Sequence, residues 1–80
     1  SNLSRVMDFH PDFIKIDAKF IKNLLNNKNA YIITKIIKDL AGNIGAFTVA
    51  EFVCHKDIQN AVVALGIEFS QGYYIMEPAA

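Results

Sequence analysis

The chain has 80 residues, and its eight basic and eight acidic side chains give a formal net charge of zero. Without a positive field it has no general attraction to nucleic acid or to anionic lipid, so we expect no DNA, RNA or membrane partner. Hydrophobic residues make up 52% of the sequence, which is high for so small a domain because it has little interior relative to its surface. We therefore expect some apolar surface to meet another subunit, another domain or a further part of the same fold.

The cysteine content and the hydrophobic runs indicate the compartment. Cys54 is the single cysteine, which excludes an internal disulfide and fits a reducing environment. No apolar run approaches the ~18 residues of a membrane span, and no charged and then apolar leader opens the chain. We expect a cytoplasmic protein.

The first quarter of the chain reads as a short helix, a strand and a second helix. Residues 3–9 are amphipathic, and Pro11 pushes His10 out of the helical region. The stretch FIKID at 13–17 is short and rich in Phe and Ile, which favours a strand. Asp17 then suits the N-cap of a helix over 18–25, and the polar run NNKN at 26–29 predicts a break.

A longer helix is predicted over about 29–43. Its aliphatic residues recur every three or four positions, which predicts one face to bury. These residues are Ile33, Ile36, Ile37, Leu40 and Ile44. The glycines at 42 and 45 supply the stop signal.

The rest of the chain alternates strand, helix and strand. AFTVAEFV at 46–53 reads as a strand, residues 55–65 repeat the helical spacing up to Gly66, and IEFSQGYYI at 67–75 reads as a short aromatic strand. Strands that alternate with helices are typical of βα units on a parallel sheet with right-handed crossovers. We expect the α/β class and one domain over residues 1–80.

Each predicted strand carries polar residues at or near its carboxyl end. These are Lys15 with Asp17, then Glu51, then Gln71. In parallel α/β folds ligands bind outside the carboxyl ends of the strands, and in β/α barrels the catalytic groups lie at that face. A charge in such a strand must pair, reach water or face a bound ion or ligand.

Simpler structural explanations remain open for the same residues. Asp17 could serve only as a helix N-cap, Lys15 and Glu51 could form an ion pair across neighbouring strands, and Gln71 could belong to a turn. His10, Cys54 and His55 lack the spacing of a metal site. Spacing alone thus predicts a parallel α/β unit with a polar cluster at one end.

The residues of the three strands resemble a known family. KID at 15–17 with Phe20 three residues on, AE at 50–51 and QGY at 71–73 are similar to the last motifs of the EAL family of bacterial cyclic di-GMP phosphodiesterases. The resemblance runs through essentially the whole chain. It implies a partial (β/α)8 TIM-type barrel, with about three parallel strands and their helices from the C-terminal part of the barrel.

The resemblance also implies roles for the polar residues. Lys15 would correspond to the lysine that contacts the attacking water, Glu51 to a metal-ligating glutamate, and Gln71 and Asp17 to ligand-binding positions. The intact family holds two Mg²⁺ or Mn²⁺ ions, and two-metal hydrolysis needs a cluster of oxygen ligands. The E-x-L and D-D-F-G motifs that supply most of these ligands lie outside this sequence, so we expect this chain alone to bind no metal cofactor.

The chain departs from the family at the motif E-G-V-E. Here the motif reads Glu51-Phe52-Val53-Cys54, so an aromatic residue replaces a glycine and a thiol replaces the second carboxylate. We expect an inactive or incomplete EAL-like signalling module that acts by protein interaction, as a homo-oligomer or with a partner signalling domain. The alternatives are a fragment of a longer phosphodiesterase and a receptor that binds cyclic di-GMP weakly without cleaving it.

Overall fold

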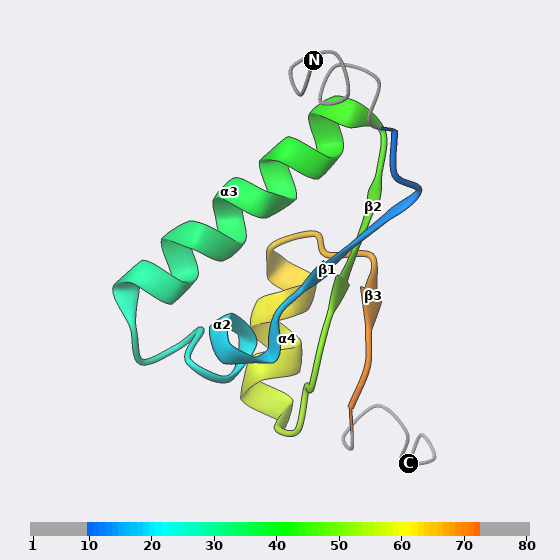
Figure 1. Cartoon of the computed structure of the whole chain (residues 1–80). Coiled ribbons are helices and arrows are strands. Elements are labelled where there is room, and N and C mark those ends of the chain that lie inside the picture. Colours follow the sequence, from blue (N-terminus) through cyan, green and yellow to red (C-terminus); the bar gives the residue numbers. More distant parts are fainter. Residues whose placement is uncertain (1–9, 73–80) are drawn as a thin grey trace.

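The computed structural model describes residues 10–72, which form a three-stranded sheet and three helices (Figure 1). In chain order these are β1 (Phe13–Ile16), α2 (Ala18–Lys22), α3 (Lys28–Ile44), β2 (Phe47–Ala50), α4 (Lys56–Ala64) and β3 (Phe69–Ser70). The strands are parallel and lie in the order β1-β2-β3. The predicted α/β class is confirmed. The predicted helix at 3–9 and the end of the predicted strand at 67–75 lie outside the described residues.

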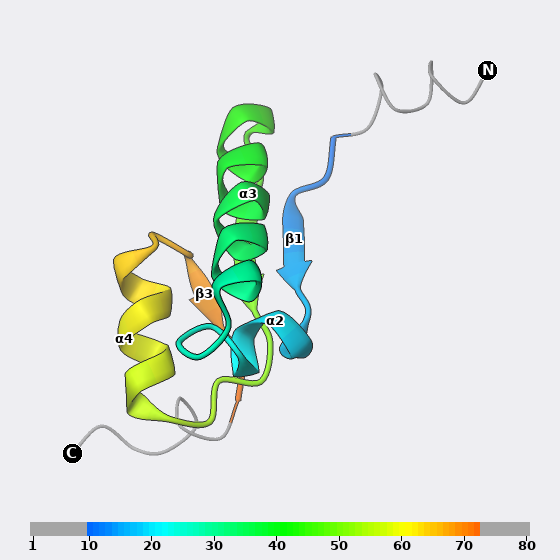
Figure 2. The ribbon, with the colours of Figure 1, turned by 90° about the vertical axis from the view of Figure 1, so that its left-hand side faces the viewer.

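The longer helices, α3 and α4, lie on the same side of the sheet (Figures 1 and 2). The core fills the space between this side of the sheet and the helices. Strand β2 is the central strand of the sheet. The buried members of the core are Ile16, Ile21, Leu24, Ala50, Val53, Ile58, Val62 and Ile67. The described part of the chain places no helix on the opposite side, which we call the open face of the sheet.

Capping side chains set where the first two helices begin. Asp17 is the N-cap of α2, and its carboxylate accepts a 2.8 Å hydrogen bond from the Lys19 N–H, which confirms the predicted cap. Helix α2 ends at Lys22 and not at residue 25, and residues 23–26 form turns. Asn27 caps α3 by accepting hydrogen bonds from the N–H groups of Asn29 and Ala30.

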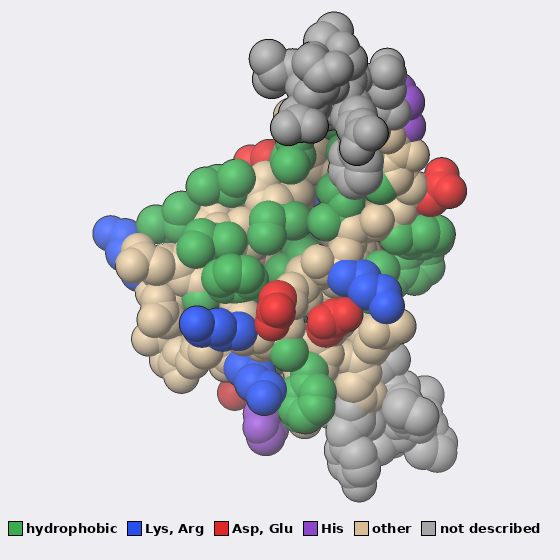
Figure 3. All heavy atoms as spheres, viewed as in Figure 1, with side chains coloured by type: hydrophobic (Ala, Val, Ile, Leu, Met, Phe, Trp, Pro, Cys, Tyr) green, Lys and Arg blue, Asp and Glu red, His purple; other side chains and the backbone are tan. Residues whose placement is uncertain are grey.

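The expectation for the buried face of α3 is wrong in part. The buried residues of α3 are the small Ala30, Thr34 and Ala41, which allow the helix to lie close to the sheet. Ile36 and Leu40 are 60% and 53% exposed and Ile33 is 36% exposed, although periodicity predicted them to be buried. Hydrophobic side chains therefore cover the visible face of α3 (Figure 3).

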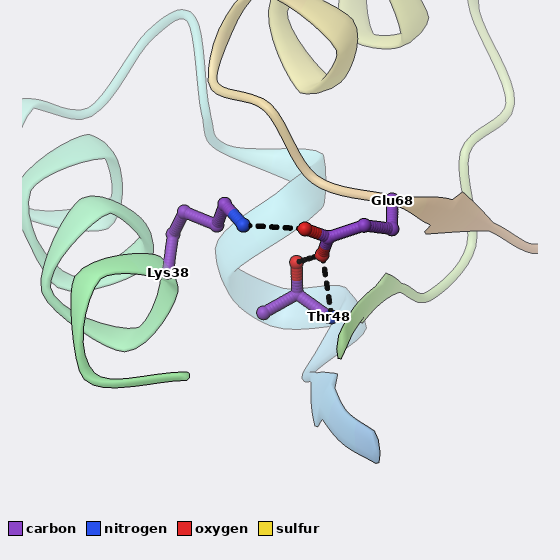
Figure 4. Close-up of polar contacts among 3 residues, drawn as sticks. All are labelled: Lys38, Thr48 and Glu68. Atoms are coloured by element: carbon purple, nitrogen blue, oxygen red, sulfur yellow. Dashed lines mark hydrogen bonds and ion pairs between the residues drawn. The ribbon is translucent and has the colours of Figure 1, made fainter. Parts of the chain in front are cut away.

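An ion pair joins α3 to the segment before β3 (Figure 4). The Lys38 Nζ lies 2.6 Å from one Glu68 carboxylate oxygen, and the other oxygen accepts hydrogen bonds from the N–H and the hydroxyl of Thr48 at 2.8 and 2.7 Å. The Lys38 ammonium, followed by the Thr48 donors, lowers the pKa of Glu68 from 4.5 to about 2. The pair therefore links α3, β2 and β3 at the amino ends of the strands.

Candidate functional site

The residues that follow the three strands lie at one level of the sheet. Ile16 pairs with Ala50 and Ala50 pairs with Ser70, so the next residues along each strand are Asp17, Glu51 and Gln71. The backbone hydrogen bonds continue this register, because the Glu51 N–H bonds to the Ile16 carbonyl at 3.1 Å and the Gln71 N–H bonds to the Ala50 carbonyl at 2.9 Å. The structure thus brings three of the four predicted site residues to the same edge of the sheet.

Strand alternation places Lys15, the fourth predicted site residue, and Glu51 on the open face. Phe13, Phe47 and Phe69 gather on this face, with ring centres 5.7–5.8 Å apart, and each is about half exposed. Side chains two residues apart share a face, so Lys15 lies on the side of Phe13, and Glu51 on the side of Phe47. In a closed barrel this face would be the interior, where catalytic groups approach the carboxyl ends of the strands.

The proposed structural ion pair between Lys15 and Glu51 does not form. Within residues 10–72 the ion pair that the structure contains is that of Lys38 with Glu68, and no side-chain hydrogen bond joins Lys15, Glu51 or Gln71 to another described residue. Lys15 is exposed and Glu51 is half-buried. Their roles as catalytic and metal-binding residues remain predictions.

Strand β2 is shorter than predicted because the chain bulges at Phe52. The regular strand covers Phe47–Ala50, and Phe52 has φ 64°, in the left-handed region that non-glycine residues rarely adopt. Gln71 bonds to Ala50 through its N–H and to Val53 through its carbonyl, at 2.7 Å, so the bonded residues are three apart where a regular parallel ladder has two. One extra residue is therefore inserted at position 52.

The bulge decides which side chains face the core. Strict alternation from Glu51 would place Val53 on the open face, but Val53 is fully buried in the core with Ala50. The left-handed turn at Phe52 thus leaves Glu51 on the open face while it returns Val53 to the core. A β-bulge of this kind normally uses glycine at the left-handed position.

The neighbouring strand accommodates the bulge through Gly72. Gly72 has φ 148°, and a β-carbon on it would collide with the backbone nitrogen and the carbonyl oxygen of Val53. The glycine of QGY therefore allows two backbones to approach closely, which goes beyond the turn that the sequence suggested.

Sequence reasoning missed the contact that holds Phe52. The Lys22 Nζ at the end of α2 lies 4.4 Å from the centre of the Phe52 ring, in a cation–π contact. A cavity of about 190 Å³ lies beside this pair, lined by Lys22, Phe52, Cys54, His55 and Ile58. The two residues lie 30 positions apart, so no local pattern indicated the contact. A larger hollow of about 500 Å³, lined by residues 24–28 and Tyr31, contains none of the predicted site residues.

The potential metal ligands among residues 10–72, which we call the donor set, do not form a metal centre. No group of three His, Cys, Asp or Glu side chains in this part of the chain lies close enough together to hold a metal ion. Glu51 is a single carboxylate, Asp17 caps α2, and Mg²⁺ and Mn²⁺ favour about six oxygen ligands. None of the helices in the same range has the length and hydrophobicity that a membrane crossing requires.

Comparison with known proteins decides the family. The family model for the EAL domain matches residues 1–78. The chain belongs to the EAL family. It is 43% identical over 67 residues to the cyclic di-GMP phosphodiesterase PdeB of Shewanella oneidensis, a match that covers 84% of this chain and 8% of that protein. It is 37% identical over 78 residues to the cyclic di-GMP phosphodiesterase PdeF of Escherichia coli, covering 98% of this chain and 10% of that protein.

Solved structures of EAL proteins confirm the fold. The EAL enzyme Bd1971, in a form with cAMP and cyclic di-GMP bound, matches 99% of this chain with a TM-score of 0.84 and 26% identity, and the match covers 21% of that enzyme. Three parallel strands with their helices thus correspond to part of an EAL barrel. The chain spans about a tenth of the curated relatives and about a fifth of the solved EAL enzyme.

Proposed function

We propose that this EAL chain is an incomplete, non-hydrolysing signalling module, related to cyclic di-GMP turnover, that acts by protein interaction. The carrying observation is the mismatch between the predicted roles and the donor set. Lys15, Glu51 and Gln71 lie at the carboxyl ends of the strands, but the described residues supply one free carboxylate on the open face where two cations need many oxygen ligands.

The open face of the sheet supports the interaction part of the proposal. The half-exposed Phe13, Phe47 and Phe69 form an apolar cluster on it, and β1 and β3 are edge strands on either side. Exposed edges and apolar faces are features that natural proteins cover. A second copy of the chain or a partner signalling domain would cover them.

Light scattering on F47S tests this role of the open face. We expect the parent chain to self-associate at micromolar concentration, and F47S to shift it toward the monomer without unfolding it, because Phe47 is half exposed. The matched control is V63S, which removes an apolar side chain that is 64% exposed on α4, on the helical side of the sheet. A parent chain that stays monomeric, or equal effects of the two variants, would remove the homo-oligomer from the proposal.

A second candidate is a piece of a longer phosphodiesterase. Its supporting observation is the small share of each relative that the chain covers, which leaves room for further metal ligands upstream. The sequence of the full gene tests this candidate directly. E-x-L and D-D-F-G motifs encoded upstream of residue 1 would favour it, and their absence would rule it out. Phe52 and Cys54 would still predict weak hydrolysis in such a protein.

A third candidate is a receptor that binds cyclic di-GMP without cleaving it. Lys15 and Gln71 offer a charge and an amide at the strand ends. The chain offers one side of a binding groove, so we expect any binding of cyclic di-GMP to be weak. Calorimetry that gives no heat, or a dissociation constant weaker than ~1 mM, would remove this candidate.

A further inference from the structure

Phe52 is a strained residue whose side chain contributes little to the core. Its φ of 64° lies where glycine is favoured, and the side chain is 52% exposed. Burial therefore does not explain why an aromatic side chain occupies this bulge. An observed backbone outlier beside a candidate site is grounds for a functional hypothesis.

The cavity beside Phe52 has the lining of a site for a flat aromatic group. The Phe52 ring forms one wall, the buried Ile58 adds an apolar surface, and Lys22 and His55 supply polar nitrogens. Its volume of about 190 Å³ is below the ~300 Å³ at which pockets for whole small molecules begin, so it accommodates one part of a ligand. A single planar ring system fits this description.

The position of the cavity indicates what the rest of the ligand would be. Phe52 directly follows Glu51, and Glu51 lies at the level of Gln71 at the carboxyl ends of the strands. Basic, acidic and hydrophobic side chains meet on the surface at this end of the sheet (Figure 3). A ligand that carries both a phosphate and a heterocycle could therefore contact Lys15 and Gln71 through the phosphate while its ring reaches Phe52.

We propose that Phe52 is a stacking platform for one nucleobase of a phosphodiester ligand, with the Lys22 ammonium held in cation–π contact with the phenyl ring. Stacking on an aromatic side chain tolerates any base, since every base has a π-face. The proposal rests on the relation to cyclic di-GMP proposed above, because that relation supplies the phosphodiester at the strand ends. It assigns a binding function to the residue at which this chain departs from the glycine of its family.

The test is a titration of the ¹⁵N-labelled chain followed by nuclear magnetic resonance. Guanosine monophosphate is expected to shift the amides of Lys22, Cys54, His55 and Ile58, whereas ribose 5-phosphate, which lacks the base, is expected to leave them in place. F52G removes the ring and the strain together and is expected to weaken binding about tenfold. F52W keeps a platform and is expected to bind at least as tightly as the parent chain.

The outcomes separate this proposal from the proposed function. Equal affinity of the parent chain and F52G for guanosine monophosphate would overturn the stacking platform. If cyclic di-GMP shifts the amides of residues 15 and 71 but not those around the cavity, the stacking platform fails and the relation to the dinucleotide stands. If neither nucleotide shifts any amide at millimolar concentration, the platform and the receptor candidate both fail, while the interaction module is unaffected.

Discussion

The Lys22 ammonium lies 4.4 Å from the centre of the Phe52 ring, and Phe52 is the residue at which β2 bulges. The contact joins the end of α2 to the loop between β2 and α4. It therefore fastens the segment that leaves Glu51 on the open face and returns Val53 to the core. Two opposing contributions set the stability of this loop. The cation–π contact between Lys22 and Phe52 stabilises it, and the left-handed backbone conformation of Phe52 destabilises it.

Substitutions of Phe52 measure the strain of the left-handed turn. F52A removes the ring and keeps the strain, whereas F52G removes both, so F52G should be more stable than F52A by about 1 kcal/mol. The measurement is the free energy of unfolding in urea. If the two variants are equally stable, Phe52 does not adopt the left-handed conformation in solution.

A double-mutant cycle measures the contact itself. K22A should cost about 0.5–1 kcal/mol in the parent chain, because a partly exposed cation–π contact is lost, and close to nothing in the F52G background. K19A is the matched control, since Lys19 is an exposed lysine of the same helix that makes no such contact. Equal costs of K22A in both backgrounds would show that Lys22 stabilises the chain by another route.

The two glycines at 72 and 42 should respond in opposite directions to alanine. G72A places a β-carbon against the Val53 backbone and should lower the free energy of unfolding by about 2 kcal/mol or more. G42A lies within α3 with no atom near the new β-carbon, so it should raise the free energy of unfolding by up to ~1 kcal/mol. A neutral G72A would mean that the segment after Ser70 can move away from the bulge.

Glu68 should make the stability of the chain fall in acid. Its pKa is lowered from 4.5 to about 2 by Lys38 and Thr48, so its contribution is complete above about pH 5 and is lost as the pH falls toward 2. E68Q should cost about 1 kcal/mol at pH 7, because the pair is partly exposed, and should match the parent chain near pH 2. A constant difference between the two proteins across this range would rule out the lowered pKa.

The two buried threonines provide a matched pair of variants. The Thr34 hydroxyl is buried without a hydrogen-bond partner among the described residues, so T34V should raise the free energy of unfolding by about 1 kcal/mol. The Thr48 hydroxyl donates to Glu68 at 2.7 Å, so T48V should lower it by about 1–2 kcal/mol. Destabilisation by T34V would indicate a partner for its hydroxyl in solution.

Local signals in the sequence predicted the elements of the fold well. Asp17 and the run around Asn27 marked helix starts, because capping depends on side chains within three residues of the backbone that they satisfy. Alternation of strands and helices predicted the parallel sheet, and the motifs pointed to the carboxyl ends of the strands. The register then placed Asp17, Glu51 and Gln71 at one level, as a parallel sheet requires.

Features that depend on distant residues were not predictable in the same way. The side chains of α3 recur at helical spacing, but the period does not say that Ala30 and Ala41 face the sheet while Ile36 and Leu40 stay exposed. The bulge at Phe52 left no signal in the residue type, because phenylalanine disfavours the conformation. The one indication was the glycine of the E-G-V-E motif that this stretch resembles, and the φ of 64° at Phe52 explains why glycine suits this position.

Hydrolysis of cyclic di-GMP by this chain, in Mg²⁺ and in Mn²⁺, tests the central claim most directly. The donor set on the open face predicts no turnover above a metal-free blank, and the parent chain should equal E51Q and K15A within error. Turnover that depends on metal and is lost in E51Q would contradict the claim and would make this chain an active phosphodiesterase.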